Sequence, residues 1–395
     1  MSDFDEQSVA LHSRLHGKLE VKSKVELKTR ADLSLAYTPG VAQVCLEIAK
    51  EPGRVYELTM KRNTVAVVSD GSAILGIGNL GPAAALPVME GKAVLFKEFA
   101  NVDAFPICLD TQDVDEIVDI VRAIAPVFGG INLEDISAPR CFDVEERLQD
   151  LGIPVFHDDQ HGTAIVVLSA LLNALRVTNQ NLSDCTIVFS GSGAAAIACA
   201  RLIQSAGATG LCPPVGDMIL CDSKGVVHPD RHDLNPHKRR LAEQTNRRKI
   251  KGTLADALVG AHVFIGLSQA NIVTPAMVRT MHPHPIVFAM ANPTPEIMPD
   301  AACEGGAVVI GTGRSDFPNQ INNVLAFPGV FRGALDACAI VISDEMKIAA
   351  AQTLAACVIE PTPERILPDP LDKGIGLKVG AAVAAAARRS GVCRG

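Results

Sequence analysis

Two short segments of the sequence contain residue types whose spacing indicates a particular chemistry. The first follows the apolar run TIVFS and consists of Gly191, Ser192, Gly193, Ala194, Ala195 and Ala196. Glycines let a backbone approach a dinucleotide pyrophosphate closely, and the N-terminus of a following helix offers unpaired N–H groups and a positive dipole end. In a strand–loop–helix context this run favours a dinucleotide site, although a tight turn without a ligand would give the same pattern.

The second feature is a pair of segments that both end in acidic residues. Glu134 and Asp135 close the run INLED, and Asp158 and Asp159 close the run IPVFHDD. If both runs are neighbouring parallel strands, four carboxylates converge, and their repulsion requires protons, basic partners or a cation. An all-oxygen cluster suits a hard divalent ion, Mg²⁺ or Mn²⁺. The alternative is that Asp158 or Asp159 caps the helix expected to begin near Gly162.

Asp222 closes the next apolar run, MILCD, and bears on the choice of cofactor. An acid at this place accepts hydrogen bonds from a ribose 2′-hydroxyl and repels a 2′-phosphate, so it favours NAD slightly over NADP. The basic run from Lys238 to Lys251 could still accommodate a phosphate, or it could be a solvated helical face. We therefore expect NAD or NADP, with a slight preference for NAD.

The elements that must position these residues follow from the hydrophobic pattern. Residues 113–159 alternate helix, strand, helix and strand, which predicts a βαβ unit, and the run TVAVVSDGSAILGIG predicts a hairpin hinged at Asp70 and Gly71. A helix that is apolar nearly all round follows Gly162. Five short β-branched runs then predict a doubly wound parallel sheet, and the chain returns to helix from about Asn322.

The predicted fold class is therefore α/β with two domains. Residues 1–163 are expected to form an N-terminal α/β domain for substrate and metal. Residues 164–395 are expected to form a Rossmann-like NAD(P)-binding domain whose C-terminal helices pack back on the first domain. At the ends of the later strands, Ser268, Asn292 and the run Gly311–Gly313 are expected to face one crevice, together with Asn319, Asn322 and Asn323.

Composition excludes several classes of protein. The 395 residues have a net charge of −8, which argues against a general nucleic-acid binder because such proteins need a basic face. The sequence has no uninterrupted run of 18 apolar residues, and its acidic start does not resemble a signal peptide, so we expect no membrane span. The eleven cysteines include no C-x-x-C pair, which fits a reducing, cytoplasmic setting.

Several segments together resemble one family. The resemblance to malic enzymes, particularly the short bacterial form, runs from about residue 20 to about residue 350. In chain order the segments that carry it are YTPGV from Tyr37, SDGSAILGIGNLGP from Ser69, GKAVLFKEF from Gly91, NLEDI from Asn132, FHDDQHGTA from Phe156, ANPTPE from Ala291 and FPNQINNVLAFPGVFRGALD from Phe317.

The resemblance implies roles for individual residues. It implies that Tyr37 is the general acid and Lys92 the general base, with Lys92 held at a lowered pKa by burial and a nearby cation. The residues that it implies for the remaining roles are Glu134, Asp135 and Asp159 as metal ligands, Asn292 and Asn322 as contacts to malate and nicotinamide, and Asp158 and Thr163 near the metal or cofactor. Longer relatives carry an arginine where this chain has Ala73, and Ser72 is a possible substitute.

The reaction implied by the resemblance is oxidation and decarboxylation of (S)-malate to pyruvate and CO₂ with reduction of NAD(P)⁺. The family also suggests a homodimer or larger homo-oligomer with exchanged N-terminal segments, which leaves open whether Tyr37 serves its own site or its partner's. Two alternatives remain: a malolactic-type enzyme that retains its cofactor and releases lactate, and a nucleotide-binding sensor without catalysis.

Overall fold

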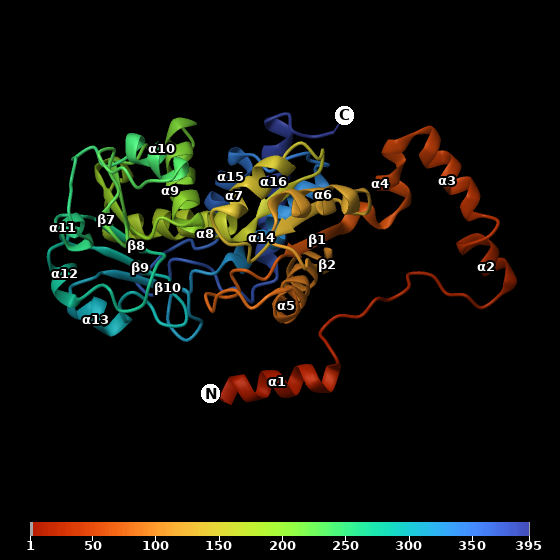
Figure 1. The fold of residues 1–395 in the computed structure, drawn as a ribbon, viewed down its shortest axis with the longest axis horizontal. Helices are drawn as coiled ribbons and strands as arrows, with labels where there is room; N and C mark the ends of the chain where they lie inside the picture. Colours follow the sequence, from red (N-terminus) through yellow and green to blue (C-terminus); the bar gives the residue numbers. More distant parts are fainter. Residues whose placement is uncertain (1–2, 395) are drawn as a thin grey trace.

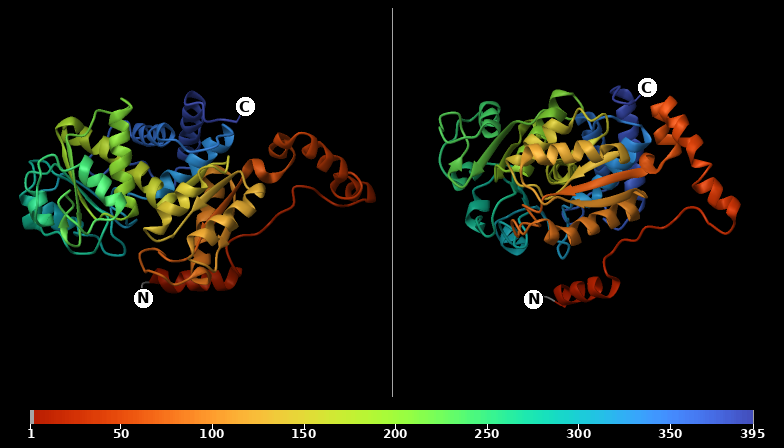
Figure 2. Two further views of the ribbon diagram at one scale, coloured as in Figure 1. Left: turned by 45° about the horizontal axis from the view of Figure 1, so that its top comes forward. Right: turned by 45° about the vertical axis from the view of Figure 1, so that its right-hand side comes forward.

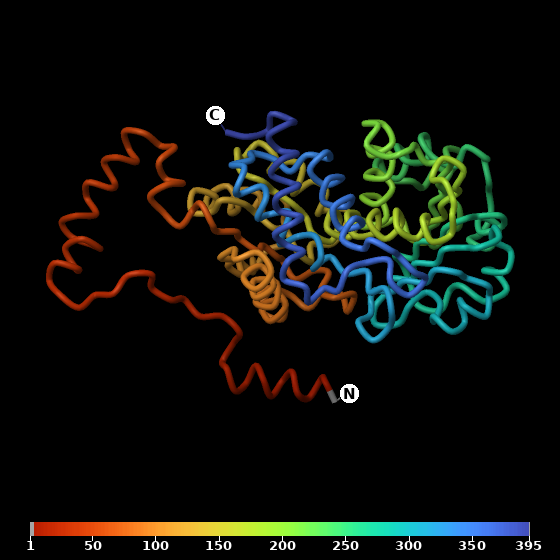
Figure 3. Tube along the Cα trace, turned by 180° about the vertical axis from the view of Figure 1, so that it is seen from behind, coloured from red at the N-terminus to blue at the C-terminus, as the bar shows by residue number. Residues whose placement is uncertain are grey.

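The computed structural model describes residues 3–394, which form an N-terminal arm and two α/β units joined by one long helix (Figure 1). The arm contains α1 (Asp3–Leu15), α2 (Arg30–Ala36) and α3 (Val41–Lys50), and it leads through α4 (Val55–Leu58) to the first sheet. Figures 1 and 3 show α2 and α3 projecting away from the rest of the chain. Neither helix buries a single residue.

The first sheet has four parallel strands in the order β2-β1-β3-β4. Its strands are β1 (Thr64–Ser69), β2 (Asp103–Cys108), β3 (Gly130–Leu133) and β4 (Val155–His157). Helix α5 (Pro82–Ala100) covers one face, and α6 (Val114–Ile124) and α7 (Arg140–Leu148) cover the other (Figure 2). The predicted βαβ unit is confirmed, since β3 and β4 pair in parallel around α7.

The predicted hairpin is wrong. β1 pairs in parallel with β2 and β3, and residues 70–81 form a loop with one isolated bridge between Ile74 and Gly78. Gly71 shows why this loop cannot continue as a strand: its φ is +67°, and a Cβ there would lie 2.3 Å from the carbonyl oxygen of Gly81. The apolar residues after Asp70 therefore belong to a loop at the carboxyl end of β1.

The second sheet contains the five predicted parallel strands and a short antiparallel edge strand. Its order is β10-β9-β8-β5-β6-β7, with β5 (Thr186–Ser190), β6 (Asp217–Asp222), β7 (Gly225–Val226), β8 (Val263–Gly266), β9 (Ile286–Ala289) and β10 (Val309–Thr312). Alternate residues of β5 separate its two faces: Ile187 and Phe189 belong to the large core with α9 (Ala194–Ala208), and Val188 belongs to a smaller core. The helices of the smaller core are α11 (Leu254–Leu258), α12 (Pro275–Arg279) and α13 (Pro299–Glu304), while α10 (Pro236–Gln244) lies beside α9.

Helix α8 (Asp158–Thr178) connects the two sheets. Among the described residues it is the one helix long and apolar enough to cross a membrane by length and composition, but most of it is buried inside the protein, as in a core helix. The C-terminal helices α14 (Phe327–Asp336), α15 (Asp344–Ala356) and α16 (Gly374–Arg389) return to the first unit, with α14 and α16 against α5 and α15 against α8. The predicted division between residues 163 and 164 falls within α8 and stays a prediction.

An aromatic cluster fixes the position of α5 relative to α14. The ring of Phe96 lies 4.8 Å from that of Phe327 and 5.3 Å from that of Phe331, both edge to face, and Phe331 also meets Phe156 of β4 at 5.7 Å. Such pairs contribute about 0.5–1.5 kcal/mol each beyond the area they bury. The cluster lies directly beneath the site described next, because Phe327 also contacts Lys92.

Candidate functional site

The structure brings the predicted acidic residues together at the carboxyl edge of the first sheet. Glu134 and Asp135 follow β3, Asp158 and Asp159 begin α8, and Glu134, Asp135 and Asp159 each offer an oxygen within 4.8 Å of the others. The backbone N–H of Asp135 donates to Asp159 Oδ2 at 2.9 Å. The helix-cap alternative is not what the structure shows, because His157 occupies the N-cap position of α8.

These carboxylates retain protons more tightly than free carboxylic acids do. Burial and the neighbouring charges of Asp159 and Glu134 raise the pKa of Asp135 to about 8, and burial also raises the pKa of Glu134 and Asp159. Asp135 Oδ2 and Asp158 Oδ1 are buried without a hydrogen-bond partner. Three converging carboxylates with an unpartnered oxygen fit a hard divalent cation, whose charge would replace the protons.

Lys92 bridges two of the four acids. Its ammonium lies 2.7 Å from Asp158 Oδ2 and 2.9 Å from Glu134 Oε1, and 4.4 Å from the centre of the Phe327 ring. Burial alone would lower the pKa of Lys92, but the two carboxylates outweigh it and the pKa is raised. Burial by itself therefore does not lower the pKa of Lys92, because two anions in direct contact stabilise the ammonium more than burial destabilises it. The lowering expected from a nearby cation stays a prediction.

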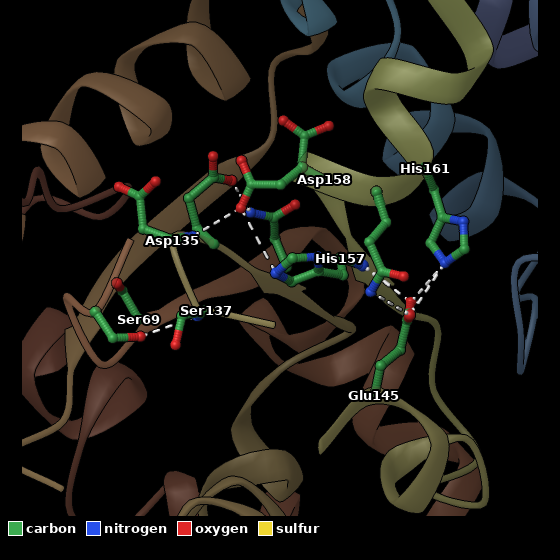
Figure 4. Close-up of polar contacts among 12 residues, drawn as sticks. Ser69, Asp135, Ser137, Glu145, His157, Asp158 and His161 are labelled. Atoms are coloured by element: carbon green, nitrogen blue, oxygen red, sulfur yellow. Dashed lines mark hydrogen bonds and ion pairs between the residues drawn. The ribbon is translucent and has the colours of Figure 1, made fainter. Parts of the chain in front are cut away.

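Glu145 of α7 is a site residue that the sequence analysis missed. Its carboxylate accepts the backbone N–H of His157 at 3.1 Å and Gln160 Nε2 at 3.1 Å, and it lies 2.9 Å from His161 Nε2. Figure 4 shows Glu145 beside the start of α8 and pointing toward His161. Glu145 thus holds the turn that presents Asp158 and Asp159. It could have been found as an acid among the apolar residues Cys141, Val144 and Leu148, which share its helix face.

Ser72 occupies the loop after β1, but its hydroxyl is already engaged. It donates to Asp70 Oδ1 at 2.6 Å and accepts the backbone N–H of Ser137 at 2.9 Å, and Asp70 also pairs with Arg140 at 3.1 Å. The hydroxyl of Ser72 therefore holds the loop to the segment after β3, and a contact from Ser72 to substrate stays a prediction.

The glycine run lies where the sequence predicts it, between β5 and α9. Gly191 has φ +111°, and a Cβ there would lie 2.5 Å from the carbonyl oxygen of Leu267, so only glycine fits the turn. A Cβ at Gly193 would meet no atom within 4 Å. The loop is thus closed toward the sheet at Gly191 and open at Gly193, as a pyrophosphate would require. Ser192 and Ala196 are buried, and Ala194 and Ala195 are half-buried in the first turn of α9.

The asparagines of the later strand ends fall into two groups. Asn292 lies against the first unit, since a Cβ built on Gly76 would be 3.3 Å from the carbonyl oxygen of Asn292. Asn322 caps a short 3₁₀ helix (Asn323–Leu325) that lies beside the start of α8. Asn319 instead holds backbone, donating to Ile310 and Pro363 and accepting from Ile366. Asn292 and Asn322 therefore lie where the two units meet, together with Thr163 on the second turn of α8, whereas Asn319 is structural.

Glu296 is a second residue that the sequence analysis missed. Its buried carboxylate accepts the backbone N–H groups of Ser268 at 2.8 Å and Ala291 at 3.0 Å, and it therefore ties together the loops that follow β8 and β9. Ser268 also shares a hydrogen bond with Ser190 at 2.8 Å. Glu296 thus shapes the carboxyl edge of the second sheet from a fully buried position.

Tyr37 is the one predicted catalytic residue that the structure places away from the others. It follows α2 in the projecting arm and is 68% exposed, whereas Lys92 lies on α5 among the acids (Figure 1). Within one chain, Tyr37 and Lys92 do not form a site.

A buried lysine among carboxylates on one sheet and a dinucleotide-type glycine loop on the other define a two-domain, NAD(P)-dependent oxidoreductase. Comparison with known proteins identifies the family. The malic enzyme NAD-binding domain matches residues 160–388, and the malic enzyme N-terminal domain matches residues 16–114 and 111–149. The chain belongs to the malic enzyme family, whose members are NAD(P)-dependent, malate-decarboxylating oxidoreductases.

Two curated relatives and one solved structure illustrate the similarity. The bifunctional malic/malolactic enzyme of Bacillus subtilis (strain 168) is 54% identical over 98% of this chain and 94% of its own length. The NAD-dependent malic enzyme of Geobacillus stearothermophilus is 55% identical over 96% of this chain and 78% of its own. The crystal structure of malic enzyme from Pyrococcus horikoshii Ot3 superposes with a TM-score of 0.94 at 48% identity, covering 99% of this chain and 92% of that one.

The raised pKa of Asp135 predicts a pH-dependent metal affinity. Because Asp135 holds its proton up to about pH 8, a divalent cation must displace that proton at lower pH. We expect the affinity for Mn²⁺, measured by titration calorimetry, to rise about tenfold per pH unit below pH 8 for each proton displaced, and to level off above it. The Asp135→Asn variant should bind Mn²⁺ more weakly and with a flatter pH dependence. An affinity independent of pH between about 6 and 8 would contradict this assignment.

Proposed function

We propose that this chain catalyses the oxidative decarboxylation of (S)-malate to pyruvate and CO₂ with reduction of NAD(P)⁺ and with a divalent cation, Mg²⁺ or Mn²⁺. The observation that carries the proposal is the buried contact of Lys92 with Asp158 and Glu134, because Glu134 also belongs to the three-carboxylate group that could hold a cation. The proposed compartment is the reducing cytoplasm, where the eleven cysteines, all free in the structure, stay as thiols.

The residues have separable roles in this reaction. Glu134, Asp135 and Asp159 would hold the cation, which supplies a Lewis acid for the malate hydroxyl. Lys92 would take the hydroxyl proton as the neutral amine, after giving up its own proton, and the positive charge of a bound cation would favour that neutral form. The nicotinamide would supply the acceptor for the hydride of C2. Asp158 fixes the ammonium of Lys92 at 2.7 Å and so orients it. After CO₂ departs from C4, Tyr37 donates a proton to C3, which gives pyruvate.

Backbone N–H groups would bind the pyrophosphate of the dinucleotide. They belong to the glycine loop from Gly191 to Gly193 and to the first turn of α9. Asn292 and Asn322 would orient malate and the nicotinamide, because they lie where the two units meet. Both assignments depend on the position of these residues between the two sheets.

A second copy of the chain would complete the site. The arm exposes a series of large apolar side chains, and the loop beside the acids exposes another series; these residues are Leu19, Val21, Val25, Leu27, Leu33, Leu35 and Leu46 in the arm, and Leu75, Ile77 and Leu80 in the loop. Exposed apolar surface of this extent marks a contact with another molecule. We propose a homodimer, or a larger homo-oligomer, in which the arm of one subunit carries Tyr37 to the site of its partner.

Conversion of malate to lactate is a second candidate function. It is favoured by the relative from Bacillus subtilis, which is named as a bifunctional malic/malolactic enzyme and is 54% identical over nearly the whole chain. The same residues would serve, with the reduced cofactor retained and used to reduce pyruvate.

The proposed reaction predicts equal amounts of reduced cofactor and pyruvate from malate. The purified protein is mixed with malate, Mn²⁺ and NAD⁺ or NADP⁺, and both products are measured, by nicotinamide absorbance and by a pyruvate assay. Lactate without net reduction of cofactor would favour the malolactic reaction. The absence of any product with either cofactor would overturn both.

Removal of the Lys92 ammonium should abolish malate oxidation. We expect Lys92→Ala to lower kcat by about 10²–10⁴-fold, the usual contribution of a general base, while NAD⁺ still binds in a direct titration. Lys97→Ala is the matched control, since Lys97 lies on the same helix but pairs with Asp103 at the surface. Turnover by Lys92→Ala equal to that of the control would contradict the role of Lys92.

Exchange of the arm predicts complementation between two inactive variants. In a dimer that combines Tyr37→Phe with Lys92→Ala, one of the two sites receives an intact tyrosine and an intact lysine only if Tyr37 acts in the partner's site. Random mixing by refolding or co-expression should then restore about a quarter of the wild-type activity, since half the dimers are mixed and each has one intact site. No recovery in mixed dimers would place Tyr37 in its own subunit's site.

A further inference from the structure

The arm reaches the first sheet through a short segment, residues 51–58, that we call the arm root. It ends in α4 and is followed by a 3₁₀ turn (Met60–Asn63) and β1. Tyr56 of α4 is half-buried, whereas every residue of α2 and α3 is exposed or partly exposed. Figure 3 shows α3 projecting away from the body beyond this root. The contacts of the root therefore bear on the direction of the whole arm.

Arg394 holds the aromatic ring of Tyr56 against the body. Its guanidinium lies 4.0 Å from the centre of the Tyr56 ring, which is a cation–π contact. Its Nη2 and Nε also donate to the carbonyl oxygen of Gly152, at 2.6 and 3.2 Å. Because Gly152 lies between α7 and β4, Arg394 connects the arm root to the first sheet.

The backbone around Arg394 is fixed as well. The backbone N–H of Arg394 donates to the carbonyl oxygen of Cys338 at 2.9 Å, and that of Ile340 donates to the carbonyl oxygen of Val392 at 2.9 Å. The two segments also form an isolated antiparallel bridge. The side chain of Arg394 therefore starts from a fixed point beside the end of α14.

A second cation contacts the same ring. Lys61, in the turn after α4, has its ammonium 5.3 Å from the centre of the Tyr56 ring. That ammonium is held in turn by the carbonyl oxygens of Ala125 and Phe128, at 2.8 and 2.7 Å. The ring of Tyr56 thus lies against one cation from the adjoining turn and one, Arg394, from a distant part of the chain.

Contacts within the arm connect its root to Tyr37. Arg54 of the root pairs with Glu47 of α3 and, at 3.3 Å, with Glu57 of α4. At the other end of α3, the backbone N–H of Val41 donates to the carbonyl oxygen of Tyr37 at 2.8 Å. Tyr37 therefore moves with α3, and α3 moves with the root.

The length of α3 makes the position of Tyr37 sensitive to the direction of the root. Its 10 residues at about 1.5 Å each span about 15 Å, so a rotation of about 10° at the root would move its far end by about 3 Å. A general acid has to lie within hydrogen-bond reach of the atom that it protonates. A rotation of this size would therefore remove Tyr37 from its place of action.

The other attachment of the arm does not fix the direction of α3. Lys18, just after α1, donates to Glu90 and to the carbonyl oxygen of Pro87, at 3.2 and 2.8 Å. Within the described chain, residues 19–29 between this attachment and α2 contain no helix or strand. This extended segment can bend, so the direction of α3 depends on the root.

We propose that Arg394 and Tyr56 form a clamp that directs the arm of their own subunit, so that Tyr37 reaches the site of the partner. Both are positioning residues for the protonation of C3, since they act through α4 and α3 rather than on the substrate. The inference rests on the arm exchange of the proposed function and adds which contact of the chain controls it.

The test uses mixed dimers with one active site. One chain carries Lys92→Ala and the other Tyr37→Phe, and two different affinity tags isolate the mixed dimers, which should have about half of the wild-type activity. Arg394→Ala is then added to either chain. In the Lys92→Ala chain, whose arm supplies the intact Tyr37, we expect kcat to fall about 10–100-fold, because a small misplacement of a catalytic group costs up to about 100-fold. In the Tyr37→Phe chain, whose arm serves the inactive site, we expect no change.

Three further variants make the result specific. Tyr56→Leu removes the other half of the clamp and should reproduce the effect in the same chain, which keeps the test intact if Arg394→Ala fails to fold by circular dichroism. Tyr56→Phe keeps the ring and should keep the activity. Arg388→Ala is the matched control, since Arg388 lies in the last turn of α16 and donates to the carbonyl oxygen of Asp336 at 3.4 Å.

The possible results separate this inference from the proposed function. An equal loss of activity from Arg394→Ala in both chains, or no loss in either, would overturn the clamp, and so would full activity of Tyr56→Leu. If the mixed dimers are active before Arg394→Ala is added, such a result removes only this inference. If they are inactive from the start, the arm exchange is lost and the clamp with it.

Discussion

Repulsion among buried carboxylates is the constraint on which the rest of the structure depends. Four acids lie at the ends of β3 and β4, and burial raises the pKa of each of them, to about 8 for Asp135 and Asp158. Lys92 supplies part of the compensation, and it can do so only because α5 is fixed against α14 through Phe96, Phe327 and Phe331. Breaking a buried ion pair by removing one partner costs about 3–5 kcal/mol, so the aromatic packing and the charge arrangement stabilise each other.

The same constraint explains the network around α8. The positive end of the helix dipole stabilises the two adjacent acids that begin α8, but it does not fix the orientation of their side chains. Glu145 does this from α7 by holding His157, Gln160 and His161. On the second sheet Glu296 plays a comparable part for the loops after β8 and β9. In both units a buried carboxylate therefore holds backbone at the carboxyl edge of the sheet through hydrogen bonds.

Much of the fold and part of the acidic site can be predicted from the sequence, because hydrophobic periodicity and acids at strand ends depend directly on local structure. The βαβ unit, the five parallel strands and the convergence of Glu134, Asp135 and Asp159 all follow from it. Lys92, which the family resemblance indicates, is also visible in the hydrophobic pattern, since it stands in the buried stripe of α5 that includes Met89 and Phe96. The hairpin prediction is wrong because the apolar residues after Asp70 form a loop, and Gly71 at its start turns the chain away from the sheet.

The remaining features depend on contacts between residues distant in the chain, which a single sequence does not show. Asp222 has the expected place, but its hydrogen bonds come from Arg231 in a following loop and Lys238 in α10, so its chemical state is set by tertiary structure. The direction of the Lys92 pKa shift likewise depends on which carboxylates touch it. The location of Tyr37 in a projecting arm gives no periodic signal at all.

Helix α8 has a consequence for how the molecule loses its structure. Its first turn holds Asp158 and Asp159, its body packs on α9 behind the glycine loop, and α15 lies along it. One continuous apolar core includes Val65 of the first sheet, Val166 of α8 and Ile187 of the second sheet. The two α/β units are therefore expected to unfold together, because unfolding of either one would expose the shared core to water. Catalysis between them would be lost in the same transition.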